Sequence, residues 1–175
     1  IRIIIEPRDM YRFGYVIDLD RETGLLLKTQ TISNGHKALE TIQFAHISYA
    51  NDVPVDTEAA ILHEAQHPHF QRPAVNSPVV HTWNLGWLPA GFAATDSTIG
   101  IAGRRTYTDG LAVFSVFLED LDSQIHPGEG LVRVGGTTVY TRGLLIAAQP
   151  VLVTVIGEVP VNTARMVADS VKWVQ

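Results

Sequence analysis

The residues best placed to do chemistry lie between Ile61 and Phe70, a stretch that contains His-Glu-Ala-Gln-His from His63 to His67. This is the H-E-x-x-H pattern of zinc metalloproteases. Two histidines one helical turn apart share a zinc ion, and the glutamate, here Glu64, activates the water bound to it. The pattern raises the hypothesis of a zinc hydrolase, which also needs a third protein ligand.

The sequence around this motif does not supply that ligand. The extended form of the motif needs glycine and histidine where the chain has Phe70 and Pro73, and no glutamate occurs between Glu64 and Glu119. Pro68 ends a helix at this point, because proline lacks the backbone donor and clashes with the preceding turn. We therefore predict no catalytic residue and no cofactor, and only adventitious metal binding by the histidines of the stretch, His63, His67 and His69.

Other short motifs favour ordinary structure over chemistry. The acidic run from Asp18 to Glu22 begins like a calcium loop, but threonine stands where that loop needs its sixth-position glycine and its twelfth-position glutamate. The paired glycines Gly135-Gly136 precede a predicted strand and not a helix, so they do not form a phosphate-binding turn. Arg104 and Arg105 remain open to two readings, since they could bind an acidic partner or face solvent.

Composition limits the classes of protein that the chain can be. It has 175 residues, of which 46% are hydrophobic, so it can bury a core. Its formal net charge of -5 argues against a general nucleic-acid binder. The absence of cysteine excludes disulfides, thiolate zinc sites and cysteine nucleophiles. The chain opens on Ile1-Arg2-Ile3-Ile4-Ile5, which is typical of a strand, so we expect it to begin inside a fold.

Residues 1–50 have the pattern of a β-meander. From Tyr11 to Leu19 large apolar residues alternate with others at a period of two, which places them on one face of a strand. Further strands are predicted over Leu25–Ile32 and Ala38–Tyr49, with Asn34-Gly35 between them as a type I′ hairpin turn.

The remaining sequence predicts a linker and then a second β-rich region. A short helix from Asp56 or Thr57 ends at Pro68, and a proline-containing linker follows to Pro78. A terminal amphipathic helix is predicted from the spacing of Ala164, Val167, Ala168 and Val171. The strands predicted between them are Thr82–Trp87, Phe92–Ile101, Arg104–Thr108, Leu111–Leu118, Leu131–Arg142 and Leu144–Ile156, with a hairpin at Asp109-Gly110.

Four phrases occur in one order along the chain: YRFGYVIDLDRETGLLLKTQTI, WLPAGF, YTDGLAVFSVFLE and VTVIGEVPVNTARMVADSV. Together they resemble the MucB/RseB family of periplasmic regulators over nearly the whole chain. The resemblance implies an α+β, β-rich fold. Residues 1–50 would be the last strands of an antiparallel sheet similar to LolA and LolB, 51–80 a short helix and linker, and 81–175 a small antiparallel sheet packed with a C-terminal helix.

The resemblance also implies a function. Members of this family bind the periplasmic part of a transmembrane anti-sigma factor, MucA or RseA, and shield it from regulated proteolysis. Lipid or lipopolysaccharide signals relieve the binding, and no enzymatic step is involved. The alternatives are an acyl-chain binding protein related to the lipoprotein carriers and, more remotely, the zinc hydrolase described above.

Two sets of site residues follow from these hypotheses. The oligomeric state is open, and a homodimer is one possibility. Aromatic and arginine side chains near the linker and in the second region are the predicted partner-binding residues, namely Trp83, Trp87, Phe92, Arg104, Arg105 and Tyr107. The predicted lipid-facing residues are Tyr11, Phe13, Tyr15 and Ile17.

Overall fold

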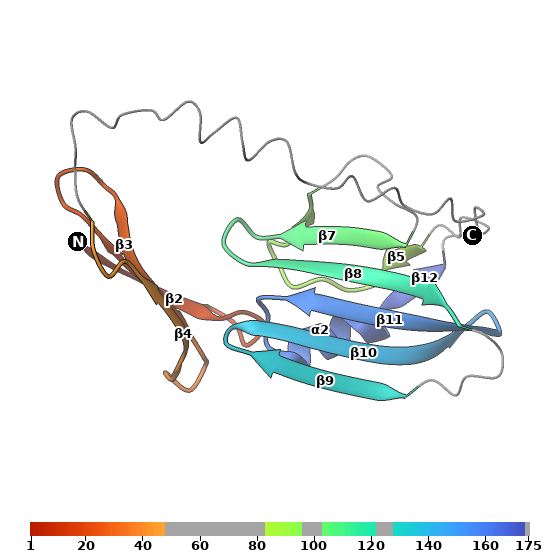
Figure 1. The fold of residues 1–175 in the computed structure, drawn as a ribbon. Coiled ribbons are helices and arrows are strands. Elements are labelled where there is room, and N and C mark those ends of the chain that lie inside the picture. Colours follow the sequence, from red (N-terminus) through yellow and green to blue (C-terminus); the bar gives the residue numbers. More distant parts are fainter. Residues whose placement is uncertain (48–82, 96–102, 122–127, 174–175) are drawn as a thin grey trace, which may run out of the picture. The chain divides into compact units, whose positions relative to one another are not determined.

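The computed structural model describes residues 1–47, 83–95, 103–121 and 128–173 (Figure 1). Contacts divide the chain into a unit made of residues 1–43 and 80–175 and a second unit made of residues 44–79. The predicted linker helix and the histidines His63, His67 and His69 lie outside the described residues. The division at residues 50 and 80 stays a prediction.

The first sheet is an antiparallel meander of four strands in chain order, β1 (Arg2–Ile5), β2 (Gly14–Leu19), β3 (Leu26–Ile32) and β4 (Ala38–Gln43). The strand predicted over Tyr11–Leu19 begins only at Gly14, because residues before it form irregular structure. The turn between β2 and β3 is held by the side chain of Asp20. The Asp20 carboxylate accepts hydrogen bonds from the backbone and hydroxyl of Thr23, and Gly24 adopts a positive φ of 70°.

The hairpin between β3 and β4 forms where Asn34-Gly35 predicts it, but not as a type I′ turn. The Ser33 backbone N–H donates to the Lys37 carbonyl, and the residue with positive φ is His36, at 58°. The pairing register shifts between Thr31 and Ile32 on the adjoining strand. A three-residue loop that ends in a left-handed residue and a bulge explains both observations.

The second sheet is larger and is also antiparallel between neighbours. Its strands lie in the order β6-β7-β8-β11-β10-β9. Their bounds are β6 (Ala93–Ala94), β7 (Arg104–Thr108), β8 (Val113–Asp120), β9 (Glu129–Val134), β10 (Thr137–Ile146) and β11 (Gln149–Gly157).

Two strand boundaries of this sheet differ from the prediction. The sequence places one strand over Leu131–Arg142 and another from Leu144, yet Gly143 lies inside the continuous strand β10. The chain reverses instead at Gly135-Gly136 and at Ala147-Ala148, each a two-residue connection between paired strands. Gly143 lies in the ladder opposite Leu152, so this glycine does not end the strand.

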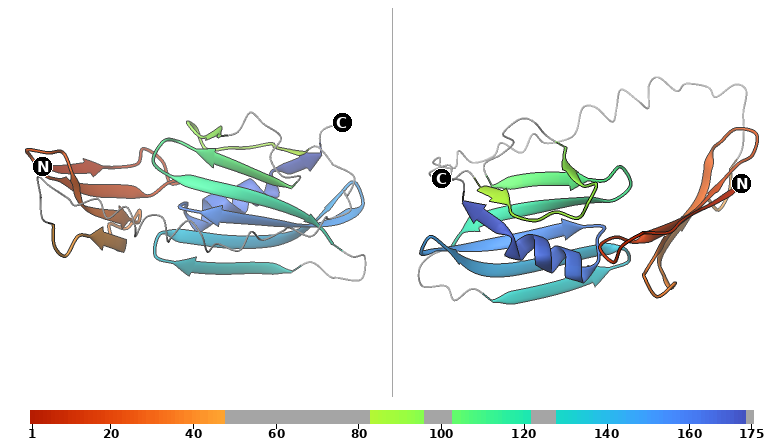
Figure 2. Two further views of the ribbon diagram at one scale, coloured as in Figure 1. Left: turned by 45° about the horizontal axis from the view of Figure 1, so that its top comes forward. Right: turned by 180° about the vertical axis from the view of Figure 1, so that it is seen from behind.

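One helix, α2 (Val161–Asp169), packs on one face of the second sheet, as predicted (Figure 2). Its buried face consists of Thr163, Ala164, Val167 and Ala168, whose small side chains allow close approach to the strands. Beyond the helix the sequence predicted no strand. Val171–Trp173 forms β12, which pairs with β5 (Trp83–Leu85). Within the described part of the chain, no helix has the length and apolar character needed to cross a membrane.

The core lies between α2 and the inner face of the second sheet. Phe114, Val116, Tyr140, Val153 and Val155 are all fully buried there. Alternate residues of β8 and β11 supply this layer, which explains the period-two pattern in their sequences.

Candidate functional site

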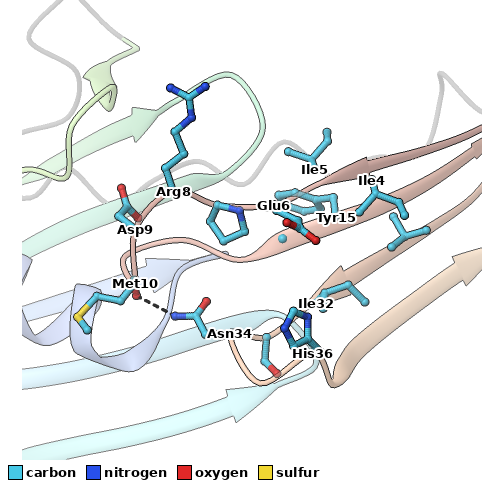
Figure 3. Close-up of a pocket in the computed structure, with 14 residues that line it drawn as sticks. Ile4, Ile5, Glu6, Arg8, Asp9, Met10, Tyr15, Ile32, Asn34 and His36 are labelled. Carbon is cyan, nitrogen blue, oxygen red and sulfur yellow. Dashed lines mark hydrogen bonds between the residues drawn. The ribbon is translucent and has the colours of Figure 1, made fainter.

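The first sheet carries an apolar pocket of about 690 Å³ (Figure 3). It is enclosed by β1, β2, the segment that follows β1 and the hairpin at residues 33–36. Ile4 and Val16 are opposite each other in the β1–β2 register, so their side chains share the sheet face on which the pocket lies. The pocket therefore follows from the pleat of the first two strands.

Gly14 allows the segment after β1 to fold back and close this pocket. A Cβ atom at Gly14 would lie 3.0 Å from the Ile5 carbonyl oxygen and 3.3 Å from Cδ of Pro7. The opposite side is tied by Asn34, whose amide donates to the Met10 carbonyl at 3.3 Å, as Figure 3 shows.

The pocket combines an apolar floor with a polar rim. Ile4, Val16 and Ile32 supply apolar surface, and Ile4 remains 62% exposed. Charged and polar side chains surround them, namely Glu6, Arg8, Asp9 and His36. An open apolar concavity with a charged margin is suited to an acyl chain or to apolar side chains of a peptide.

A second cluster centres on Arg12, on the segment between β1 and β2. Its guanidinium donates to the Asp109 carboxylate at 2.8 Å and to the Asp9 carboxylate at 3.2 Å, and it also donates to the carbonyl of Ala90. The guanidinium carbon lies 5.3 Å from the ring centre of Phe92. Because the Arg12 side chain is 20% exposed and that of Asp109 only 9%, the ion pair is largely shielded from water.

Backbone groups beside Arg12 are held by the first turn of α2. The Thr163 hydroxyl donates to the Tyr11 carbonyl at 2.8 Å, and the Asn162 amide donates to the Met10 carbonyl at 3.3 Å. The Tyr11 ring meets Trp87 edge to face at 5.1 Å. This segment is therefore fixed to the second sheet's helix and loops by several independent contacts.

An unusual polar group lies near this cluster. The Tyr15 hydroxyl is buried and has no hydrogen-bond partner among the described residues. Burial, together with the charges of Glu158 and Asp109, raises the pKa of Tyr15 to about 12. Burial and then the neighbouring Glu40 also raise the pKa of Glu158. Tyr15 therefore stays protonated at neutral pH and does not act as a base.

Three of the predicted partner-binding residues lie in the core. Trp83, Phe92 and Tyr107 are 3%, 8% and 4% exposed. Phe92 and Tyr107 both pack on Phe114, with ring centres 5.2 and 5.3 Å away. Their position in the hydrophobic core accounts for their residue types without any partner.

The other three predicted partner-binding residues are more accessible than the buried ones. Trp87 is partly buried against Tyr11, and Arg104 is exposed at the start of β7. Arg105 is half-buried. Its guanidinium stacks over Trp83 at 4.9 Å and donates to Asn84. The contact role of all six residues stays a prediction.

The predicted lipid-facing residues lie mostly away from the pocket. Phe13 and Tyr15 are buried and line a smaller hollow of about 390 Å³ with Arg12 and Asp109. Tyr11 lies outside the strand, and Ile17 lines neither pocket. Of the four, Tyr15 alone also lines the larger pocket.

Sequence reasoning named Tyr15 but missed the aliphatic residues of the pocket, because it followed the aromatic side chains. Ile4, Val16 and Ile32 lie on the other face of the sheet from Tyr15 and Ile17. Within the described ranges no group of three or more metal-binding side chains occurs.

Comparison with known proteins identifies the family. The MucB/RseB C-terminal domain matches residues 77–172, which is more than half of the chain, and the MucB/RseB N-terminal domain matches residues 2–63. The chain belongs to the MucB/RseB family. Two curated members are the sigma factor AlgU regulatory protein MucB of Pseudomonas aeruginosa and the sigma-E factor regulatory protein RseB of Haemophilus influenzae.

The chain is 34% identical to MucB, and the match covers 97% of this chain and 55% of MucB. It is 28% identical to RseB, and that match covers 99% of this chain and 54% of RseB. It therefore spans about half the length of these relatives. Among solved structures, MucB in complex with MucA(peri) matches with a TM-score of 0.76 at 31% identity, covering 99% of this chain and 62% of that one.

A Pseudomonas aeruginosa MucA/MucB complex matches with a TM-score of 0.77 at 32% identity. The match covers 99% of this chain and 59% of the chain in that structure. The β-rich fold with antiparallel sheets and one packed helix is thus confirmed as that of the MucB/RseB family.

Proposed function

We propose that this chain is part of a periplasmic regulator that binds the periplasmic part of a transmembrane anti-sigma factor of the MucA/RseA kind. Binding would deny the anti-sigma factor to regulated proteolysis, so the envelope-stress sigma factor stays sequestered. The observation that carries the proposal is the match of 99% of this chain to MucB in its complex with MucA(peri). The mechanism is occlusion, and the proposal assigns the chain no catalytic step.

Titration calorimetry tests the proposal, with this chain in the cell and the periplasmic segment of the anti-sigma factor in the syringe. We expect saturable binding in about the micromolar range or tighter. If no heat of binding appears, the same titration with the full-length mature regulator separates two explanations. Binding only by the longer protein would place part of the site outside this chain, and absence of binding by both would refute the occlusion mechanism.

Arg104 is the predicted contact residue that can be tested most cleanly. It is exposed, whereas Arg105 is half-buried and stacks over Trp83. We expect Arg104→Glu to weaken anti-sigma binding without unfolding the protein, because a rim charge steers the encounter. Arg21→Glu, in the exposed turn after β2, is the matched control. Equal affinity of both variants would remove Arg104 from the contact surface.

The pocket of the first sheet favours a second, compatible function, the binding of an acyl chain. Its apolar floor and charged rim fit a lipid whose head group stays near the surface. Ile4→Ser should reduce lipid retained after mild extraction, measured by native mass spectrometry. Ile42→Ser is the matched control, since Ile42 is 61% exposed on the same sheet but does not line the pocket.

If both functions hold, lipid should weaken anti-sigma binding. Two ligands that favour different states of one protein reduce each other's affinity by the same factor. Calorimetry of the anti-sigma segment with and without saturating lipid measures that factor. Equal affinities in the two titrations would leave the lipid without a regulatory role.

A further inference from the structure

Strand β9 is an open edge of the second sheet. Among the described residues it pairs with β10 alone, in one continuous register from Glu129 to Val134. All six of its residues are exposed, including Leu131 at 49% and Val134 at 72%. An apolar edge without proline or bulge is a template for pairing with another strand.

The direction of the free backbone groups can be derived from one hydrogen bond. The Gly143 N–H donates to the Gly128 carbonyl at 3.1 Å, so the polar groups of Gly128 point toward β10. These groups alternate sides along a strand, so those of residues 130 and 132 also point inward. The backbone N–H and C=O groups of Glu129, Leu131 and Arg133 therefore point outward at the free edge.

The side chains of these same three residues share one face. Glu129, Leu131 and Arg133 are opposite Arg142, Tyr140 and Thr138 of β10, which places them on the side of the sheet that carries α2. Glu129 and Arg133 thus lie two positions before and two positions after Leu131, on the same face of the sheet. This arrangement is complementary to itself when the strand is turned through 180°.

We propose that β9 pairs with β9 of a second copy of this chain, antiparallel and about a twofold axis at Leu131. In this register Leu131 is opposite its own counterpart, and each Glu129 is opposite Arg133 of the other copy. All outward backbone groups of residues 129, 131 and 133 then find partners, and two opposite-charge pairs flank the axis.

Neighbouring registers are less favourable. Centring the axis on Val132 places each Arg133 opposite Leu131 of the other copy, so neither charge meets its complement. Glu129 also accepts a hydrogen bond from Arg165 at 2.7 Å, and a carboxylate has enough acceptor sites on its two oxygens to accept from a second arginine as well. Charge pairing therefore selects the Leu131 register.

The dimer should be weak, because one pair of six-residue edges buries less area than a standard stable interface. We expect sedimentation velocity to detect dimers at about 100 μM chain and their dissociation on dilution. Arg133→Glu places two like-charge pairs at the axis and should raise the dissociation constant about tenfold or more. The charge-swapped variant E129R/R133E restores two attractive pairs and should recover most of the association.

A cross-linking experiment tests the register directly. The chain has no cysteine, so Leu131→Cys introduces a single thiol. Directly opposed residues of a hydrogen-bonded antiparallel pair have Cα atoms about 5.5 Å apart, within disulfide range. Mild oxidation should link this variant into covalent dimers. Leu145→Cys is the control, because Leu145 is 73% exposed and lies at the far end of β10.

The proposal is overturned if the wild-type chain stays monomeric at about 500 μM, if Arg133→Glu changes nothing, or if Leu145→Cys links as fast as Leu131→Cys. A further result would reassign the edge. If the chain is monomeric but Arg133→Glu weakens binding of the anti-sigma segment, the edge belongs to that partner and not to a second copy. Anti-sigma binding can fail while the dimer forms, so the two proposals are tested separately.

Discussion

Arg12 and Asp109 lie far apart in the sequence and join at 2.8 Å in a setting that shields both side chains from water. Asp109 also accepts hydrogen bonds from the backbone of Leu111 and Ala112, so it holds its own hairpin while it receives Arg12. The ion pair therefore connects the segment before β2 to the turn between β7 and β8.

We expect Arg12→Ala to lower the free energy of unfolding by about 2–3 kcal/mol, because it leaves Asp109 shielded without its cationic partner. The loss stays moderate because the two backbone bonds to Asp109 remain. Thermal denaturation measures the effect. Arg2→Ala is the control, since Arg2 makes an equally short contact with Asp18 at 2.7 Å but on the surface. Equal losses in both variants would contradict this reasoning.

Gly157 should not tolerate a side chain. A Cβ atom there would lie 2.3 Å from the Val113 carbonyl oxygen and 2.4 Å from Cα of Phe114, both backbone atoms that cannot turn aside. We expect Gly157→Ala to cost about 3 kcal/mol or more. Gly128→Ala has open space around it and should unfold like the wild type. Chemical denaturation of the two variants compares them.

The turn between β10 and β11 is made from two residues that disfavour its geometry. Ala147 and Ala148 have φ angles of 52° and 67°, a conformation that costs about 1–2 kcal/mol for each residue with a Cβ atom. Replacing them with Asn-Gly, the preferred pair for such a turn, should stabilise the protein by about 1–2 kcal/mol. A lower melting temperature in the double variant would mean that the alanines serve another contact.

Glu158 should give the protein a distinctive pH dependence. Burial and Glu40 raise the pKa of Glu158, so the folded state binds its proton more tightly than the unfolded state does. The stability that this tighter proton binding adds is therefore fully present below pH 4.5, the ordinary pKa of a glutamate. It is lost as the pH rises through the raised pKa of Glu158. We expect Glu158→Gln to remove this loss and to flatten the stability profile above pH 4.5.

Carboxylates with lowered pKa values provide the contrast. Arg2 lowers the pKa of Asp18, and Arg165 lowers that of Glu129. Their contributions are present above the ordinary values and disappear as pH falls through the lowered ones. The two effects fall in separate pH windows. Melting curves of wild type and Glu158→Gln should differ near neutrality and converge in acid, and a difference that persists in acid would contradict the assignment.

The strands of this fold could be predicted where a local signal marks their ends. The strand Arg104–Thr108 is confirmed to the residue, because Asp109-Gly110 ends it in a turn stabilised by the Asp109 side chain. The boundary at Gly143 was wrong because glycine was taken as a break in a strand that continues through it. Ala147-Ala148 carries no turn signal at all, so that reversal could not be found from composition.

The pocket could not be predicted because both faces of the first sheet carry apolar residues. Tyr15 and Ile17 drew attention to one face, but Ile4 and Val16 of the other face line the hollow together with Tyr15. The choice of face depends on the fold-back after β1, which brings Pro7 over Gly14. That is a tertiary contact, and the spacing of residues within one strand does not specify it.

The pairing of β5 with β12 has a consequence for how the protein acquires its shape. Trp83 is directly opposite Trp173, so β5 cannot form this pairing until the chain has been synthesised as far as β12. Pairing β5 with β12 closes a long loop, so the entropic cost of this pairing is incurred late in folding. A chain that emerges slowly would present β5 unpaired until β12 has followed it, and β5 is open to a chaperone during that interval.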